Sequence, residues 1–245
     1  MFGAQAPSGR WWTYDTPMDG RRRAFYHSGN GQCMPGAPEL SCCFTNAARG
    51  LGMLSQWAVM RAHEGLVVNS YVPGVLSADT PEGQPVTLDV LTEYPLDGRV
   101  AMRLHLSRPE RFVVKLRVPQ WSASTWFATN DEAPASVAPG TYLDLARIWQ
   151  EGDKIDLQLD LSLHFWKGEQ ECAGLTSIYR GPLLLAYDQR FNSMDPDDVP
   201  TLLGSQLQAR WVPWSRKPLP WLLLGFKAMD GREVALCDFA SAGVA

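Results

Sequence analysis

The sequence predicts a mainly β protein in which antiparallel β-sandwich domains follow a short helical segment. Helical spacing of apolar residues persists in one stretch only, residues 46–62. From Gly65 onward, apolar and polar residues alternate in several short runs. Residues typical of turns, such as Pro95-Leu96-Asp97-Gly98, separate these runs. Short alternating strands with frequent turns are typical of an antiparallel sandwich.

The first 40 residues precede any periodic pattern and are rich in glycine, proline and aromatic residues. Long irregular segments inside compact domains often carry function. This segment is therefore the first place to look for binding residues.

The predicted helix over residues 46–62 has an unusually wide apolar surface. Its apolar positions are Ala47, Ala48, Leu51, Leu54, Trp57, Ala58 and Met60. A helix that is apolar over most of its circumference needs partners on several sides. We therefore expect it to be one member of a helical array whose other members lie outside this chain.

The predicted strands follow one another from Leu66 to Tyr187. They are expected over 66–72, 84–94, 100–106, 112–118, 142 onward, 155–161, 176–180 and 183–187. Beyond Asn192 the pattern weakens, although Asp230-Gly231 could close a last hairpin between residues 226 and 239. We predict domain boundaries that separate residues 1–64, a β-sandwich over 65–190, and a C-terminal β extension or truncated second sandwich over 191–245.

Composition restricts the partners and the compartment. The 245 residues include 45% hydrophobic and 20% charged residues and carry a formal net charge of −4, which argues against a nucleic-acid partner. Five cysteines at irregular spacing do not resemble a disulfide framework. Together with the lack of a visible signal peptide, they predict a cytoplasmic protein. No apolar run is long enough to span a bilayer, so we expect no membrane partner.

The most informative motif is the cysteine pair Cys42-Cys43, placed directly before the predicted helix. Thr45 or Asn46 could cap that helix. The partial positive charge of a helix N-terminus favours a thiolate, the form that attacks carbon and binds zinc. The alternative is that both cysteines are small buried apolar residues.

The segment from Ser41 to Arg49 resembles the Cys-Cys-x-x-Asn-x-x-Arg signature of the β-L-arabinofuranosidase-like glycoside hydrolases. Further segments similar to that family follow in the same order. They are residues 68–73, 93–98, 116–121, 147–153 and 180–183. The resemblance covers about residues 12–187.

This resemblance implies an α/α toroid catalytic domain followed by β-sandwich domains, with residues 1–64 as the end of the toroid. It also implies a zinc site held by Cys43 and Cys42, with Cys42 as the nucleophile. The other zinc ligands, a Glu and a Cys, and the acid/base Glu are implied to lie upstream. No Glu-x-Cys motif precedes Cys42 here, and Phe44-Thr45 replaces the usual prolines. We therefore expect the C-terminal part of a longer enzyme, or a degenerate member, that is inactive alone.

Three residues before the cysteine pair are candidates for contact with a sugar: His27, Trp12 and Tyr14. The aromatic residues could equally fill space in a toroid wall. The predicted activity is a retaining glycosidase that releases terminal β-L-arabinofuranose or a similar sugar. Its expected partners are a carbohydrate substrate and the missing N-terminal toroid domain. The alternative is a non-catalytic β-sandwich module that binds carbohydrate or supports a neighbouring domain.

Overall fold

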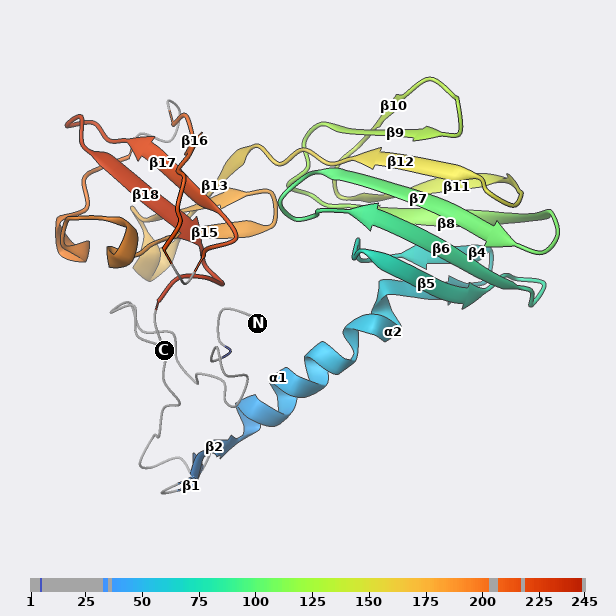
Figure 1. The fold of residues 1–245 in the computed structure, drawn as a ribbon, viewed down its shortest axis with the longest axis horizontal. Helices are drawn as coiled ribbons and strands as arrows, with labels where there is room; N and C mark the ends of the chain where they lie inside the picture. The colour runs from blue at the N-terminus through green and yellow to red at the C-terminus, as the bar shows by residue number, and fades with distance from the viewer. Residues whose placement is uncertain (1–4, 6–32, 35–36, 203–206, 217–218, 244–245) are drawn as a thin grey trace. The chain divides into compact units, whose positions relative to one another are not determined.

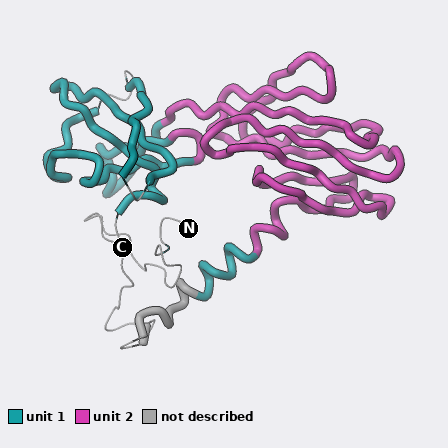
Figure 2. The backbone as a smooth tube through the Cα atoms, viewed as in Figure 1, with its two compact units in different colours: residues 1–52, 165–179, 183–245 teal, residues 53–164, 180–182 magenta. Residues whose placement is uncertain are grey.

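The computed structural model divides the chain into two compact units, which Figure 2 colours separately. Unit 1 comprises residues 1–52, 165–179 and 183–245, and unit 2 comprises residues 53–164 and 180–182. The structure describes residues 5, 33–34, 37–202, 207–216 and 219–243. Each unit is described below by itself.

Unit 2 is a β-sandwich built from two sheets (Figure 1). The larger sheet has the strand order β10-β9-β12-β7-β6-β5, and the smaller has the order β11-β8-β4-β3. The strands are β3 Val59–Ala62, β4 Gly65–Val68, β5 Gly74–Asp79, β6 Pro85–Thr92, β7 Arg99–Leu106, β8 Glu110–Val118, β9 Thr125–Thr129, β10 Ala135–Val137, β11 Thr141–Trp149 and β12 Lys154–Gln158. The predicted mainly β sandwich is confirmed.

The sandwich core comes directly from the alternating pattern. Successive strand residues point to opposite faces, so every second residue of β6, β7, β8 and β12 is buried between the sheets. Leu88, Leu104 and Leu116 are fully buried. Each such side chain contributes about 2 kcal/mol relative to an exposed one. The largest core side chain is Trp149, whose indole N–H donates to the carbonyl of Phe112 at 3.1 Å.

In the smaller sheet, β4 and β8 pair in parallel. The other two pairs of this sheet, β11 with β8 and β3 with β4, are antiparallel. Gly65 pairs with Val113 at the start of this parallel run. A Cβ atom at position 65 would lie 1.9 Å from the carbonyl oxygen of Val113. Only glycine therefore permits this approach of the two backbones.

The helical segment differs from its prediction at both ends. Helix α1 spans Cys42–Gly52, α2 spans Leu54–Ala58, and the next residues form β3 rather than a continued helix. Val59 to Ala62 pair with β4 in an antiparallel hairpin. Strand β4 follows His63 and Glu64 in the chain and contains β-branched residues, which favour strand pairing. This pairing outweighs the weak helical preference of residues 59–62. Helices precede the sandwich as predicted, and their membership in a toroid stays a prediction.

Strand β11 corrects one detail of the predicted sandwich face. Tyr142 was expected to continue the apolar pattern, but Leu145 and Trp149 point inward and Tyr142 points outward. The Tyr142 hydroxyl instead donates to the side-chain oxygen of Asn69 at 2.7 Å.

Unit 1 contains most of a second six-stranded sheet, with the order β13-β14-β15-β18-β17-β16. The predicted closing hairpin is confirmed, because β17 pairs with β18 around the turn at Asp230-Gly231. Strand β15 pairs with β18 from the other side. The predicted boundaries at 64/65 and 190/191 stay predictions. The elements are β13 Leu163–Lys167, η2 Gln170–Cys172, β14 Thr176–Arg180, β15 Leu183–Tyr187, η3 Gln189–Phe191, η4 Pro196–Asp198, β16 Arg210–Trp211, β17 Leu223–Lys227 and β18 Glu233–Asp238.

Unit 1 also includes a short strand pair that leads into α1. Strand β1, Cys33–Met34, pairs with β2, Ala37–Ser41, and α1 follows β2 without an intervening residue. None of the helices in the described ranges combines the length and apolar character needed to cross a membrane.

Candidate functional site

The cysteine pair lies in the first turn of α1 rather than before the helix, because α1 begins at Cys42. Thr45 and Asn46 are therefore interior helix residues, and the predicted caps are wrong. The backbone N–H groups of a first helical turn have no partner within the helix, and they favour a nearby negative charge. The thiolate character of Cys42 and Cys43, and their roles as nucleophile and zinc ligands, stay predictions.

Cys42 and Cys43 could supply two ligands to a zinc ion, which is half of a complete set. Thiolates are preferred zinc ligands, and zinc prefers four ligands. Among the side chains that the structure describes, no group of three or more His, Cys, Asp and Glu residues is arranged to hold a metal. The described residues therefore do not complete a zinc site, and zinc stays a prediction.

The predicted sugar-contact residues, His27, Trp12 and Tyr14, lie outside the described residues. Their roles stay predictions. The described residues instead bring together several of the other segments that resemble the family.

Four segments that resemble the family converge within unit 2. The Tyr71 hydroxyl donates to the carbonyl of Arg117 at 2.6 Å, and the Tyr71 ring meets that of Tyr94 edge-on at 6.2 Å. The Arg180 guanidinium donates to the carbonyl of Leu96 at 3.1 Å. Burial raises the pKa of both Tyr71 and Tyr94, so both phenols stay neutral. These contacts fix the end of the sandwich, and their chemistry is that of packing.

Asn69, from the same family-like segment as Tyr71, holds the end of helix α2. Its side-chain N–H donates to the carbonyl of Trp57 at 3.1 Å, and its backbone N–H donates to that of Ala58 at 2.9 Å. Its side-chain oxygen accepts from Tyr142. The carbonyls at a helix end lack partners within the helix, so Asn69 satisfies groups that α2 leaves open. We call these contacts the Asn69 clamp.

The segment over residues 147–153 contributes Trp149 to the sandwich core and Glu151 to a cluster of charged side chains on the surface. Glu151, in the turn after β11, accepts from a ring nitrogen of His105 at 2.6 Å, and Asp89 lies 3.1 Å from the other ring nitrogen. The hydrogen bond to Glu151, and then that to Asp89, raise the pKa of His105. The side chains are partly solvated, so this cluster is a surface ion-pair network.

Sequence reasoning missed the buried carboxylate of Glu110, which is 3% exposed. It accepts from the Thr80 hydroxyl and the Gln84 amide, both at 2.7 Å, and from the backbone N–H of Glu82 at 3.2 Å. Burial alone would raise the pKa of Glu110, but these hydrogen bonds outweigh it, and the pKa lies below its usual value.

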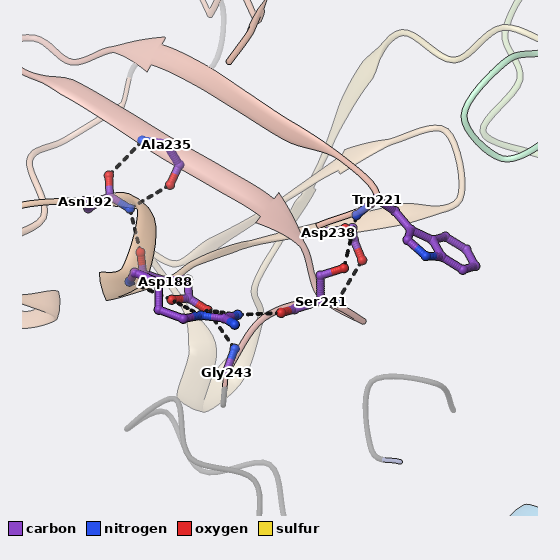
Figure 3. Close-up of polar contacts among 8 residues, drawn as sticks. Asp188, Asn192, Trp221, Ala235, Asp238, Ser241 and Gly243 are labelled. Carbon is purple, nitrogen blue, oxygen red and sulfur yellow. Dashed lines mark hydrogen bonds and ion pairs between the residues drawn. The ribbon is translucent and has the colours of Figure 1, made fainter. Parts of the chain in front are cut away.

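A second buried network, in unit 1, was also missed (Figure 3). The Arg190 guanidinium donates to both carboxylate oxygens of Asp188 and to the carbonyl of Ser241. The backbone N–H of Gly243 donates to Asp188 at 2.7 Å, and Asp238 accepts from the backbone N–H groups of Leu222 and Ser241. The network fixes the segment after β18 to the sheet.

Comparison with known proteins shows which family this chain is similar to. Residues 65–161 match the model described as the GH127 middle domain of β-L-arabinofuranosidases. No curated protein matches the sequence significantly.

Solved structures share the fold over almost the whole chain. A glycoside hydrolase aligns with 98% of this chain at 18% identity and a TM-score of 0.76. A GH127 β-L-arabinofuranosidase from Geobacillus stearothermophilus T6 aligns with 98% of it at 17% identity and a TM-score of 0.74. A GH127 β-arabinofuranosidase aligns with 98% of it at 17% identity and a TM-score of 0.73.

The present chain spans 44%, 42% and 41% of these three structures, so it corresponds to less than half of each. Its fold is theirs over the aligned part. Residues 65–161 match the GH127 middle-domain model of β-L-arabinofuranosidases, which confirms the predicted family resemblance.

Proposed function

We propose that this chain is the C-terminal part of a retaining glycoside hydrolase that releases terminal β-L-arabinofuranose or a similar sugar. The observation that carries this proposal is the pair Cys42-Cys43 in the first turn of α1, in a chain that also holds a GH127 middle domain. A helix N-terminus stabilises the thiolate that such a reaction requires. The other half of the enzyme is a preceding helical domain.

The proposed reaction consists of two displacements at the anomeric carbon, with Cys42 as the nucleophile. In the first, a carbon–sulfur bond forms, the glycosidic carbon–oxygen bond breaks, and an acid protonates the leaving oxygen. In the second, a water oxygen bonds to the anomeric carbon, the carbon–sulfur bond breaks, and the water proton passes to the conjugate base. Two inversions give net retention. The family resemblance assigns the acid/base to the preceding domain.

Zinc is the cofactor that we propose for the longer protein. When bound, it keeps coordinated thiols ionised. Cys43 and Cys42 would supply two thiolates, and the preceding domain would supply the remaining ligands.

The alternative function is a non-catalytic sandwich that supports a neighbouring domain or binds carbohydrate. The observation in its favour is that the family-like segments meet through packing contacts, such as those of Tyr71 and Arg180. A support role is compatible with the catalytic proposal for the longer protein, whereas an independent binding module is not.

Hydrolysis of an aryl β-L-arabinofuranoside by this chain and by the longer protein separates these functions. We expect no turnover by the chain alone and turnover by the longer protein. The Cys42→Ser variant should lose activity by ~10³-fold or more. Cys172 is an exposed free cysteine in η2, and Cys172→Ser is the matched control that should keep full activity.

Turnover by the longer protein that survives Cys42→Ser would contradict the assigned nucleophile. Robust turnover by the chain alone would contradict the division of the site between two domains. Glycan binding without turnover in either protein would favour the independent binding module.

A further inference from the structure

The side chain of His105 lies between two carboxylates that come from different elements of the sandwich. Its ring nitrogen Nδ1 is 2.6 Å from Glu151, in the turn between β11 and β12, and its Nε2 is 3.1 Å from Asp89 on β6. His105 itself is on β7, which pairs with β6 on one side and β12 on the other (Figure 1). The imidazole therefore connects β6 to the turn that leads into β12.

These two contacts require a proton on each ring nitrogen. An ionised carboxylate only accepts hydrogen bonds, so each nitrogen must donate. A neutral imidazole has one N–H group and one lone pair, and it can donate to only one of the two carboxylates. The lone pair on the other nitrogen would then face a carboxylate oxygen, which is a repulsive contact. The geometry around His105 is therefore that of the imidazolium.

The contact with Glu151 is the better anchored of the two. Besides its shorter distance to the ring, Glu151 accepts from the backbone N–H of Leu106 at 2.9 Å. Backbone hydrogen bonds also join its turn to β7, because Gly152 donates to the carbonyl of Leu104 at 2.9 Å. When the ring holds a single proton, that proton is therefore best placed on Nδ1, toward Glu151.

We propose that His105 is a pH-sensitive cross-link on the outer face of the larger sheet: the imidazolium holds both carboxylates, and the neutral ring keeps Glu151 and releases Asp89. The other charged groups beside the cross-link are Arg103 on β7 and Lys154 on β12. Arg103 lies directly opposite Asp89 in the sheet, and Lys154 lies opposite Arg103. Arg103 therefore offers the released carboxylate of Asp89 an alternative partner.

Acidification closes this cross-link, and a rise in pH opens it. The hydrogen bond to Glu151 has the largest effect on the pKa of His105 and raises it, partial burial lowers it, and the bond to Asp89 raises it, so that the pKa is raised in all. The cross-link therefore stabilises the fold below the unfolded pKa of the imidazole, and this contribution is lost as pH rises through the folded pKa. Histidine is the side chain that ordinarily changes its charge near neutral pH.

Proton–nitrogen NMR spectra of the imidazole groups, recorded across a range of pH, test the cross-link in the unmodified chain. The spectrum of His105→Gln identifies the His105 signals among those of the four histidines. Below the folded pKa, both ring nitrogens of His105 should be protonated. Above it, the neutral ring should carry its proton on Nδ1. A neutral ring with its proton on Nε2 would overturn the proposed release of Asp89.

Two substitutions measure the two contacts separately. Glu151→Gln and Asp89→Asn should each lower the titration midpoint of His105, and the decrease should be larger for Glu151→Gln. Asp156→Asn is the matched control, because Asp156 is on the same face of the sheet but pairs with Arg99. It should leave the midpoint unchanged. A midpoint that falls in neither variant, in Glu151→Gln alone, or equally in the control would overturn the cross-link.

Urea unfolding measures the direction of the pH dependence. At about pH 5.5, below the ordinary pKa of histidine, the unmodified chain should unfold at a higher urea concentration than His105→Gln. This difference should shrink as pH rises through the folded pKa of His105. A difference that stays constant or grows with pH would show that the imidazolium does not hold the two carboxylates together.

Discussion

Glu110 and Asn69 have roles that depend on partners distant in the sequence. The oxygens of Glu110 accept from Thr80 and Gln84, which lie 30 and 26 residues away. Asn69 accepts from Tyr142 across 73 residues. No local pattern connects such pairs, so a single sequence does not reveal them. The inward apolar residues Leu88, Leu104 and Leu116 were predictable, because their signal is the alternation of their own strands.

Replacement of Glu110 by leucine should lower the free energy of unfolding by about 2–4 kcal/mol, because it leaves the buried Thr80 hydroxyl and the partly buried backbone N–H of Glu82 without this acceptor and removes one of the two acceptors of the Gln84 amide. The pKa of Glu110 is lowered in the folded state. Its ionised form therefore stabilises the fold above the unfolded pKa, and this contribution is lost as pH falls through the folded pKa. Urea unfolding at pH 7 and at acidic pH measures both effects.

Glu82 provides the control, since its side chain is exposed and pairs with Arg108 on the surface. Glu82→Gln should change stability by less than about 1 kcal/mol. If Glu110→Leu unfolds at the same urea concentration as the unmodified protein at pH 7, the buried network contributes nothing.

Among the elements, those that carry a local signal of their own were predictable, and those whose conformation depends on pairing with another strand were not. The hairpin of β17 and β18 was predicted because Asp230-Gly231 marks its turn. The end of the helical segment was misplaced, since β3 owes its conformation to pairing with β4. The parallel pairing of β4 with β8 was also hidden, because Val113 lies far along the chain from Gly65.

Gly65→Ala should destabilise the smaller sheet by about 2–3 kcal/mol, because the new methyl group would overlap the carbonyl of Val113. Gly52→Ala is the matched control, since a Cβ there meets nothing within 4 Å. Alanine in a helix should stabilise the protein by up to about 1 kcal/mol at that position. Thermal unfolding of the two variants makes the comparison, and equal melting temperatures would show that β4 and β8 do not approach this closely.

Asn69→Asp should lower the free energy of unfolding by about 1–2 kcal/mol, because a carboxylate would replace the N–H donor beside the Trp57 carbonyl at a helix end. Hydrogen exchange of residues 54–58 should increase at the same time. Asp144→Asn, on the same strand as Tyr142, removes a surface ion pair with Lys115 and is the control with an expected change below about 1 kcal/mol. Unchanged exchange in Asn69→Asp would show that the clamp does not hold α2.

For the whole molecule, the order of motifs predicted more than any single motif. The cysteine pair, the strand pattern and the later family-like segments together predicted a sandwich of this family, and residues 65–161 match its middle domain. The start of α1 was placed too late, because Thr45 or Asn46 was interpreted as the N-cap, although Ser41, also a residue type preferred at an N-cap, directly precedes Cys42. His27, Trp12 and Tyr14 lie outside the described residues and stay predictions.

The reactivity of Cys42 in the longer protein tests the central claim most directly. An arabinofuranosyl haloacetamide should alkylate Cys42, because the substrate-like group brings the reagent to the nucleophile and the helix N-terminus favours its thiolate. Peptide mass spectrometry should find the label on Cys42, with less label after treatment with a chelator. The Cys42→Ser variant should remain unlabelled. Label on Cys43, or equal label on Cys33 and Cys42, would contradict Cys42 as the nucleophile.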